Sequence, residues 1–313
     1  MTSIPPQPSA ATALAGASGN LRGMLMMALA TIVLASMHSM VRHVGAEVHP
    51  FEIAFFRNLF GLLVMLPWLI RAGPASLASR QPGMQALRGA VVLIAMLSWF
   101  YGLSVVPIAQ ATALSFTAAI FGSLGAVLFL GERMRLRRWT AVLIGFAGVL
   151  VILRPGLGAV DTGSLIVLLA AVSWGASLVI IKVLARTDSS VTIVAWVTIV
   201  LSVLSLPPAL VVWAWPTPTQ LMWLMLIGAL GSAGHLAMTQ ALKLSDETTA
   251  VIPVDFMRLI WTSLIGYLAF AEVPDFWVWI GGSTIFASTL YIAYREAKVT
   301  GVAPTPDKTQ ILG

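Results

Sequence analysis

The most regular feature of the chain is the alternation of long apolar blocks with short polar stretches. Each block has about 20 residues, the length that an α-helix needs to cross the ~30 Å hydrocarbon core of a bilayer. The blocks lack the alternating pattern of a membrane β-strand, and a helix satisfies its own backbone hydrogen bonds in lipid. The pattern therefore predicts an all-α integral membrane protein with ten transmembrane helices, over 22–42, 51–71, 84–104, 108–130, 138–154, 163–184, 191–214, 219–243, 248–270 and 274–294.

The composition agrees with lipid as the solvent. Hydrophobic residues make up 58% of the chain and charged residues 10%, whereas charged residues make up roughly 25% of a soluble domain. So few charges do not cover a water-facing surface. The chain has no cysteine, which excludes disulfides, thiolate metal ligands and thiol nucleophiles.

The positive charges predict how the helices are oriented. With a cytoplasmic N-terminus, 14 Lys and Arg residues lie on the cytoplasmic side, and only Arg42 and Arg154 lie on the outer side. Cytoplasmic loops carry such an excess. We therefore expect a multi-pass protein of the inner (cytoplasmic) membrane with both termini in the cytoplasm. This bias explains the net charge of +6, so membrane lipid is the expected partner of the basic loops and no nucleic acid is expected.

The chain contains an internal repeat with an offset of 140 residues. At this offset Pro67 meets Pro207, Glu132 meets Glu272, and the span positions agree. Because each copy has an odd number of spans, the copies have opposite orientations, as in many secondary carriers. We expect a disordered tail over 1–21, a five-helix repeat over 22–154, a linker over 155–162, a second five-helix repeat over 163–296 and a disordered tail over 297–313.

The last part of each copy resembles a known family. Residues 111–156 read ATALSFTAAIFGSLGAVLFLGERMRLRRWTAVLIGFAGVLVILRPG, with Gly-Glu at a span end, basic residues and a Gly-rich span. Residues 251–296 read VIPVDFMRLIWTSLIGYLAFAEVPDFWVWIGGSTIFASTLYIAYRE, with Ala271 in place of the usual glycine. Both are similar to the EamA-type repeat of the drug/metabolite transporter superfamily, and the resemblance covers about residues 22–296. It implies ten helices, a central cavity lined mainly by helices 1, 3, 4, 6, 8 and 9, and import or export of amino acids, cofactors, nucleotides or drugs.

Two charged residues lie inside a predicted span. Asp255 and Arg258 are three residues apart on one helical face, with the acid first, as a helical ion pair prefers. Ionisable side chains inside a bilayer usually face a cavity or a partner. Asp255 suits a substrate ammonium group or a coupling proton, and Arg258 suits a carboxylate or phosphate. A self-neutralising structural pair is the alternative.

The other candidates for substrate binding are polar or aromatic residues within spans. Ser115 is the uncharged counterpart of Asp255 in the first copy. His235 is either a proton relay or a neutral packing residue. Trp174 and Trp261 suit a cavity for a planar or cationic ligand. Tyr101 lies nearer a span end, where aromatic residues often anchor the helix at the membrane surface.

Structural or gating roles are expected for Arg57, Glu132 and Glu272. Arg57 is expected to pair with Glu52 or with carbonyl groups of a neighbouring helix, and contact with the substrate is the alternative. The two glutamates end matched spans on opposite sides of the membrane and are expected to fix those helix ends, and a gate is the alternative.

The histidines do not predict a metal site. His38, His43 and His49 lie near the first outer loop and are expected to be solvated, and no two have the spacing of a helical metal pair. Neither a metal nor a cofactor is expected.

These features predict a secondary active transporter that moves a small organic metabolite by alternating access, with substrate exchange or a proton gradient as the energy source. A membrane enzyme is the first alternative, although the chain has neither H-E-x-x-H nor a Gly-x-x-x-x-Gly-Lys phosphate loop. A channel is the second, although no ring of like charges is visible. Substrate, direction of transport and oligomeric state stay open.

Overall fold

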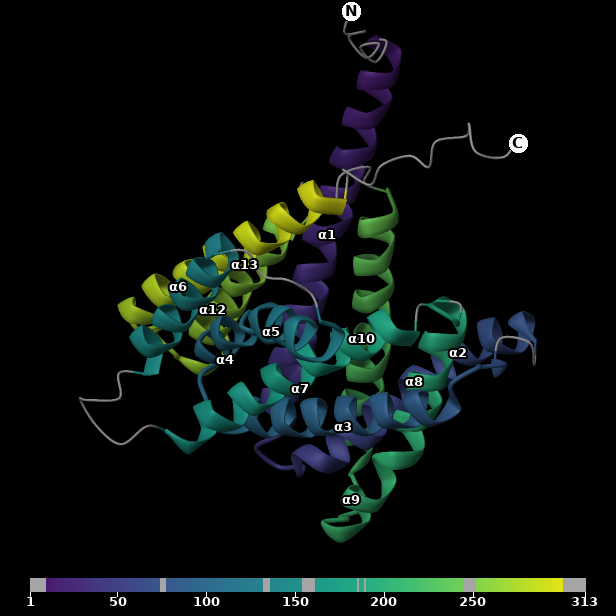
Figure 1. The fold of residues 1–313 in the computed structure, drawn as a ribbon. Helices are drawn as coiled ribbons and strands as arrows, with labels where there is room; N and C mark the ends of the chain where they lie inside the picture. The colour runs from purple at the N-terminus through teal and green to yellow at the C-terminus, as the bar shows by residue number, and fades with distance from the viewer. Residues whose placement is uncertain are drawn as a thin grey trace, which may run out of the picture.

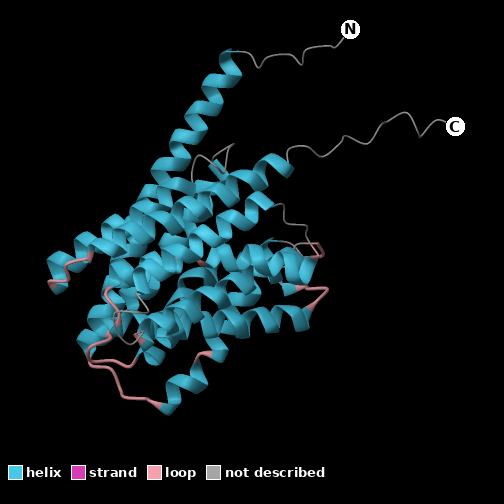
Figure 2. Cartoon of the chain, turned by 60° about the vertical axis from the view of Figure 1, so that its left-hand side comes forward, coloured by secondary structure: helices cyan, strands magenta, loops and turns pink. Residues whose placement is uncertain are grey.

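The computed structural model describes residues 10–73, 77–131, 136–153, 161–184, 186–188, 190–244 and 252–300. This part of the chain consists of helices and their connections and has no strand (Figure 2). The prediction of an all-helical chain is confirmed for these residues. In chain order the helices are α1 (Ala10–Val44), α2 (Pro50–Ala72), α3 (Pro82–Val105), α4 (Ile108–Ser115), α5 (Ala118–Leu130), α6 (Leu136–Leu153), α7 (Thr162–Leu184), α8 (Ser190–Leu204), α9 (Leu206–Val211), α10 (Pro218–Leu244), the 3-10 helix η2 (Ile252–Phe256), α12 (Met257–Phe270) and α13 (Phe276–Thr300).

Seven stretches of the described residues are helical, long and apolar enough to cross a membrane. They are Leu21–Val44, Pro50–Pro67, Pro82–Val105, Ile108–Leu130, Thr162–Leu184, Thr192–Val211 and Pro218–Met238. The other three predicted spans fall on α6, which contains the shorter apolar stretch Trp139–Leu153, on η2 with α12, and on α13. The chain is therefore a multi-pass membrane protein. Helix α1 begins at Ala10, so it extends into the segment that was expected to be a tail.

Two predicted spans are interrupted at the same place in the repeat. The first breaks at Phe116 and Thr117, between α4 and α5, and the second changes from η2 to α12 between Phe256 and Met257. The hydroxyl of Thr117 donates a hydrogen bond to the carbonyl of Leu114, 2.6 Å away. Such bonds from Ser and Thr compete with the regular helical pattern and bend helices. The 140-residue offset thus relates two backbone breaks as well as two sequences.

The segments after these breaks also end alike. Gly131, after α5, has φ +66°, and Ala271, after α12, has φ +54°. Both residues are in the left-handed region. This conformation is unfavourable for any residue with a Cβ atom, but it is not unfavourable for glycine. The second copy therefore keeps the backbone conformation of the first at Ala271, although it has alanine where glycine is favoured.

The helices of the two halves pack in exchanged pairs. Helix α1 packs along α10, and α3 packs along α7 (Figure 1). At the 140-residue offset, α7 is the counterpart of α1, and α10 is the counterpart of α3. Helix α8 is the counterpart of α2, and the contact of α2 with α10 recurs as the contact of α8 with α3. Helix α6 packs along α13, where a methyl group on Gly148 would lie 2.8 Å from the carbonyl oxygen of Gly281. Small residues allow this close approach of helix backbones.

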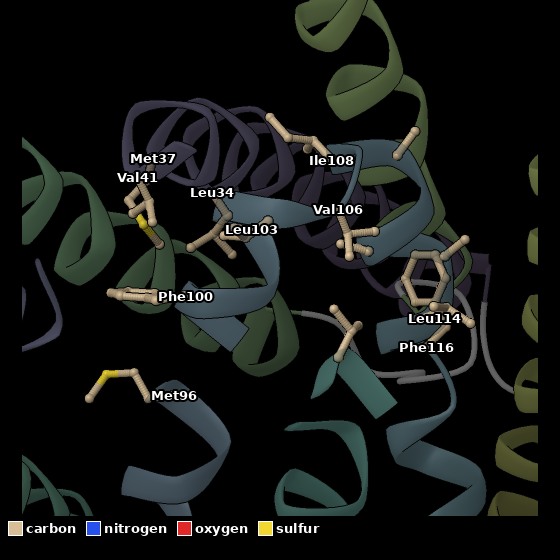
Figure 3. Close-up of a cluster of buried hydrophobic side chains, with 14 of the residues drawn as sticks. Leu34, Met37, Val41, Met96, Phe100, Leu103, Val106, Ile108, Leu114 and Phe116 are labelled. Atoms are coloured by element: carbon tan, nitrogen blue, oxygen red, sulfur yellow. The ribbon is translucent and has the colours of Figure 1, made fainter. Parts of the chain in front are cut away.

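One buried apolar cluster runs through helices of both halves. Figure 3 labels a part of it, whose side chains come from α1, α3, α4 and the residues beside them: Leu34, Met37, Val41, Met96, Phe100, Leu103, Val106, Ile108, Leu114 and Phe116. Phe116, at the break between α4 and α5, is 7% exposed. This cluster therefore packs one side of the interrupted span against α1 and α3.

Candidate functional site

The charge pair predicted in span 9 is an ion pair in the structure. An Nη2 atom of Arg258 lies 3.1 Å from Oδ2 of Asp255, and the two side chains are 19% and 29% exposed. The Cζ atom of Arg258 also lies 5.2 Å from the centroid of the Phe116 ring. The guanidinium is thus held between a carboxylate of its own span and an aromatic ring at the break in the related span.

Two histidines link Arg258 electrostatically with Arg57. His38 on α1 interacts electrostatically with Arg258, with His235 on α10 and with Arg57 on α2. His235 in turn interacts with Arg57 and Arg258. Helices α1, α2, α10 and α12 therefore place basic side chains near one another. We call Asp255, Arg258, His38, His235 and Arg57 the interior charge cluster, in which the His235 side chain is exposed.

Several polar atoms in and beside this cluster are buried without a hydrogen-bond partner among the described residues. They are Nδ1 of His38, Nε of Arg258, Nε1 of Trp261 and Oγ1 of Thr112. Trp261 lies three residues after Arg258 on the same face of α12, and Thr112 lies one turn before Phe116 on α4. Buried polar groups in folded proteins nearly always have a partner, so these four atoms indicate a place for a bound molecule or water.

Aromatic rings lie beside the ion pair. The Phe256 ring is 4.3 Å from that of Phe286 and 5.8 Å from that of Phe116, measured between centroids. His38 meets the Trp99 ring edge to face at 5.2 Å. The arrangement therefore combines cationic groups with ring faces, which suits a charged ligand that carries a planar group.

Arg57 does not have the partner that was expected. Its Nη1 donates to Oδ1 of Asn58, 3.0 Å away, while Oε1 of Glu52 accepts from the backbone N–H of Ala214, 2.8 Å away. The guanidinium lies against α10, because a methyl group on Gly231 would be 3.2 Å from Nε of Arg57. Of the two structural contacts expected for Arg57, the described residues thus show no pair with Glu52.

His38 is also placed differently from the expectation. It is 7% exposed instead of solvated. Sequence reasoning missed it because its burial depends on Trp99 of α3 and on α10, which are far away along the chain. Its position one turn after the buried Leu34 was the available signal.

Two predicted contacts lie apart from the cluster, and the hydroxyl of a third bonds within its own helix. Tyr101 is 38% exposed and Trp174 is 41% exposed, and the described residues give neither a contact with the ion pair. The hydroxyl of Ser115 donates to the carbonyl of Thr112, 2.7 Å away, within its own helix. Of the predicted substrate-binding residues, the structure thus brings together Asp255, Arg258, His235 and Trp261.

A second ion pair joins helix ends at one rim of the bundle. Arg42, at the end of α1, forms an ion pair with Glu272, which follows α12. Arg42 also donates from Nη1 to the carbonyls of Leu103 and Val106, at 2.7 and 2.9 Å. Oε2 of Glu272 accepts from the N–H of Ile108, 3.0 Å away. The pair therefore ties the ends of α1, α3 and α12 to the start of α4, while Glu132 lies outside the described residues.

Asp188 holds together two connections away from these ion pairs. It accepts hydrogen bonds from the Ser79 hydroxyl, from the Arg80 N–H at 3.0 Å and from Nε2 of Gln85 at 2.9 Å. The hydrogen bond from Ser79 is the largest cause that lowers the pKa of the Asp188 carboxyl below its ordinary value. The connection between α2 and α3 is thereby fixed to the connection between α7 and α8.

The described residues contain no group of three or more His, Asp or Glu side chains that could hold a metal ion. The structure instead presents a bundle of apolar helices with charged residues inside it and two interrupted spans, the architecture of a membrane carrier.

Comparisons with known proteins identify the family. The model of the EamA-like transporter family matches twice, over residues 21–154 and 161–294, so the chain belongs to this family. It is 33% identical over 259 residues to an S-adenosylmethionine uptake transporter of Rickettsia bellii (strain RML369-C), covering 83% of this chain and 89% of the relative. It is 34% identical over 246 residues to a riboflavin transporter of Rhizobium johnstonii (strain DSM 114642 / LMG 32736 / 3841), covering 78% and 81%.

A solved crystal structure supports the same fold. It is 19% identical, has a TM-score of 0.58, and the match covers 90% of this chain and 99% of that one. Together with the family, the relatives make this chain a transporter of small organic metabolites and not an enzyme.

Proposed function

We propose that the protein is a secondary active transporter with ten transmembrane helices in two inverted five-helix repeats, over 22–154 and 163–296, which works by alternating access. The observation that carries the proposal is the repetition of the backbone. The interruption at Phe116 recurs at Phe256, and the α1–α10 contact recurs as the α7–α3 contact. Two halves related in this way can rock about a site between them and open it to one side at a time.

The interior charge cluster is the substrate site in this proposal. Asp255 and Arg258 contact the substrate together with His235 and Trp261, and Ser115, Trp174 and Tyr101 join them in another state of the cycle. Buried partnerless atoms on α1, α4 and α12 support this site, because a bound solute would satisfy them. Arg57, Glu132 and Glu272 have structural or gating roles, and the Arg42–Glu272 pair holds the outer helix ends together.

The substrate in this proposal is a cofactor-sized metabolite with a planar ring system. The names of the relatives, an S-adenosylmethionine uptake transporter and a riboflavin transporter, support this class. The rings of Phe116, Phe256 and Phe286 beside the ion pair supply faces for such a group. Exchange of solutes or a proton gradient provides the energy.

Counterflow in proteoliposomes tests the proposed function. Vesicles are loaded with unlabelled S-adenosylmethionine or riboflavin, and uptake of the labelled compound from dilute solution is followed, with protein-free vesicles as the control. We expect transient accumulation of at least one of the two compounds in protein-containing vesicles only. No accumulation of either compound, by protein that is folded and inserted, would contradict the proposed substrate class.

The absence of cysteine from the sequence allows a direct test of the orientation. Glu47 lies in the connection after α1, Arg80 lies in the connection after α2, and both are exposed. In intact cells, a membrane-impermeant maleimide should label E47C and should label R80C only after permeabilisation. The reverse pattern would place the N-terminus outside.

A further inference from the structure

The positive groups of the interior charge cluster outnumber its negative ones. It contains the guanidinium groups of Arg57 and Arg258, but only one carboxylate, that of Asp255, which pairs with Arg258. Among the described residues, the hydrogen bond of Arg57 goes to the neutral amide of Asn58, and no carboxylate lies against it. A guanidinium inside a bilayer is costly unless it is paired. Within the part of the chain that the structure describes, one positive charge of the cluster has no counter-charge.

The position of Arg57 depends on small residues of the helix that it faces. Helices α2 and α10 approach closely at glycines, since a methyl group on Gly228 would lie 2.6 Å from Cβ of Phe60. One turn on, a methyl group on Gly231 would lie 3.2 Å from Nε and 3.5 Å from Nη2 of Arg57. The guanidinium thus lies on bare backbone of α10, one turn before His235 on the same helix face.

The partnerless buried atoms nearby include hydrogen-bond donors. The N–H groups at Nε of Arg258 and Nε1 of Trp261 only donate, and the hydroxyl of Thr112 can donate. These donors, together with an arginine that lacks a counter-charge, match a ligand group that is negatively charged and rich in acceptor oxygens. Carboxylates and phosphates are such groups, and arginine binds both through paired N–H donors.

We propose that Arg57 and Arg258 together bind an oxyanion group of the transported metabolite, a carboxylate or a phosphate, and that this group is the feature that the site requires. This inference rests on the proposed function, because it assigns a chemistry to the site of that carrier. It makes Arg57 a substrate-binding residue, in addition to the structural role considered from the sequence.

Two pairs of compounds that differ in the oxyanion test the inference. S-adenosylmethionine and its decarboxylated form differ in a carboxylate, and flavin mononucleotide and riboflavin differ in a phosphate. Binding is measured as the rise in melting temperature of the purified protein in detergent over a range of ligand concentrations. We expect the oxyanion member of at least one pair to bind at least tenfold more tightly than its partner, and the responding pair tells carboxylate from phosphate.

Variants of the cluster assign the effect to Arg57. R57Q should abolish the preference for the oxyanion member, whereas R22Q, which removes an exposed arginine of α1 outside the cluster, should keep it. Should R57Q fail to fold, G231A serves instead, because it pushes on the guanidinium without removing its charge and should weaken oxyanion binding severalfold.

Equal binding of both members of each pair, or no binding of either oxyanion compound, overturns the inference. A preference that survives in R57Q also overturns it. The proposed function is judged separately by counterflow, since exchange of a neutral solute such as riboflavin would keep the carrier and remove the oxyanion requirement.

Discussion

Between α4 and α5 the chain breaks at Phe116, and 140 residues later η2 gives way to α12 after Phe256. The first break is flanked by Ser115 and Ala118, and the second by Asp255 and Arg258. The backbones agree as far as the left-handed residues that follow each segment, Gly131 and Ala271. The repeat thus fixes the backbone, whereas the charges that flank the break lie in one copy only.

The largest effect is expected from R258A, which gives span 9 the residue of span 4 at that position. It leaves Asp255 without its cation, so we expect a loss of about 1–3 kcal/mol of stability for this partly exposed pair. Transport in the counterflow assay should fall at least tenfold. Melting in detergent and initial rates in proteoliposomes measure the two effects.

The double variant D255S/R258A separates the two roles of the pair. Because it removes both charges, its melting temperature should return close to that of the wild type while transport stays lost. Recovery of transport together with stability would mean that the pair is structural only.

The next largest effect concerns the end of span 9, where Glu272 faces Arg42. E272Q keeps the shape and hydrogen-bonding oxygen but removes the charge, so we expect a loss of about 1–2 kcal/mol for this partly buried pair. The matched control is E47Q, because Glu47 is exposed and bonds only Gln220 in the described contacts. Melting temperatures measured at one scan rate should fall for E272Q and stay unchanged for E47Q, and equal shifts would refute the role of the pair.

The two left-handed residues allow a reciprocal test of the shared backbone. A271G should stabilise the protein and G131A should destabilise it, each by about 1 kcal/mol, because only glycine adopts positive φ without cost. At Gly131 an added methyl group meets no atom within 4 Å, so conformation alone decides the effect. Shifts of the same sign in both variants would show that the two ends do not share a backbone.

The smallest effect is expected at the first break. The Phe116 ring contacts the guanidinium of Arg258 across the repeat. F116L should therefore raise the KM for transport about two- to fivefold through loss of the cation–π contact, worth about 0.5–1 kcal/mol. The control is F121L, because the Phe121 ring packs on Phe146 and has no described contact with the ion pair. F121L should leave the KM unchanged, and equal changes in both variants would contradict the assignment.

The sequence predicted those features that depend on short stretches of chain. Block length predicted the helices, and the three-residue spacing of Asp255 and Arg258 predicted their ion pair, which is present. The interruption at Phe116 was not predicted because no glycine or proline marks it, and the hydroxyl of Thr117 that bonds back to the helix gives no periodic signal.

The rest of the site could not be predicted because it is assembled from distant segments. Arg57 lies next to α10 where Gly231 leaves room for it, and His38 is buried between α1, Trp99 of α3 and α10. Neither relation follows from spacing along the chain, since helix packing decides both.

The most direct test of the account is ligand-induced stabilisation of the wild type and of D255S/R258A by one panel of cofactor-sized metabolites. A bound ligand raises the melting temperature by mass action. We expect at least one compound to stabilise the wild type and none to stabilise the variant, although the variant folds. Equal stabilisation of both proteins by the same compound would contradict the claim that the charges of span 9 form the substrate site.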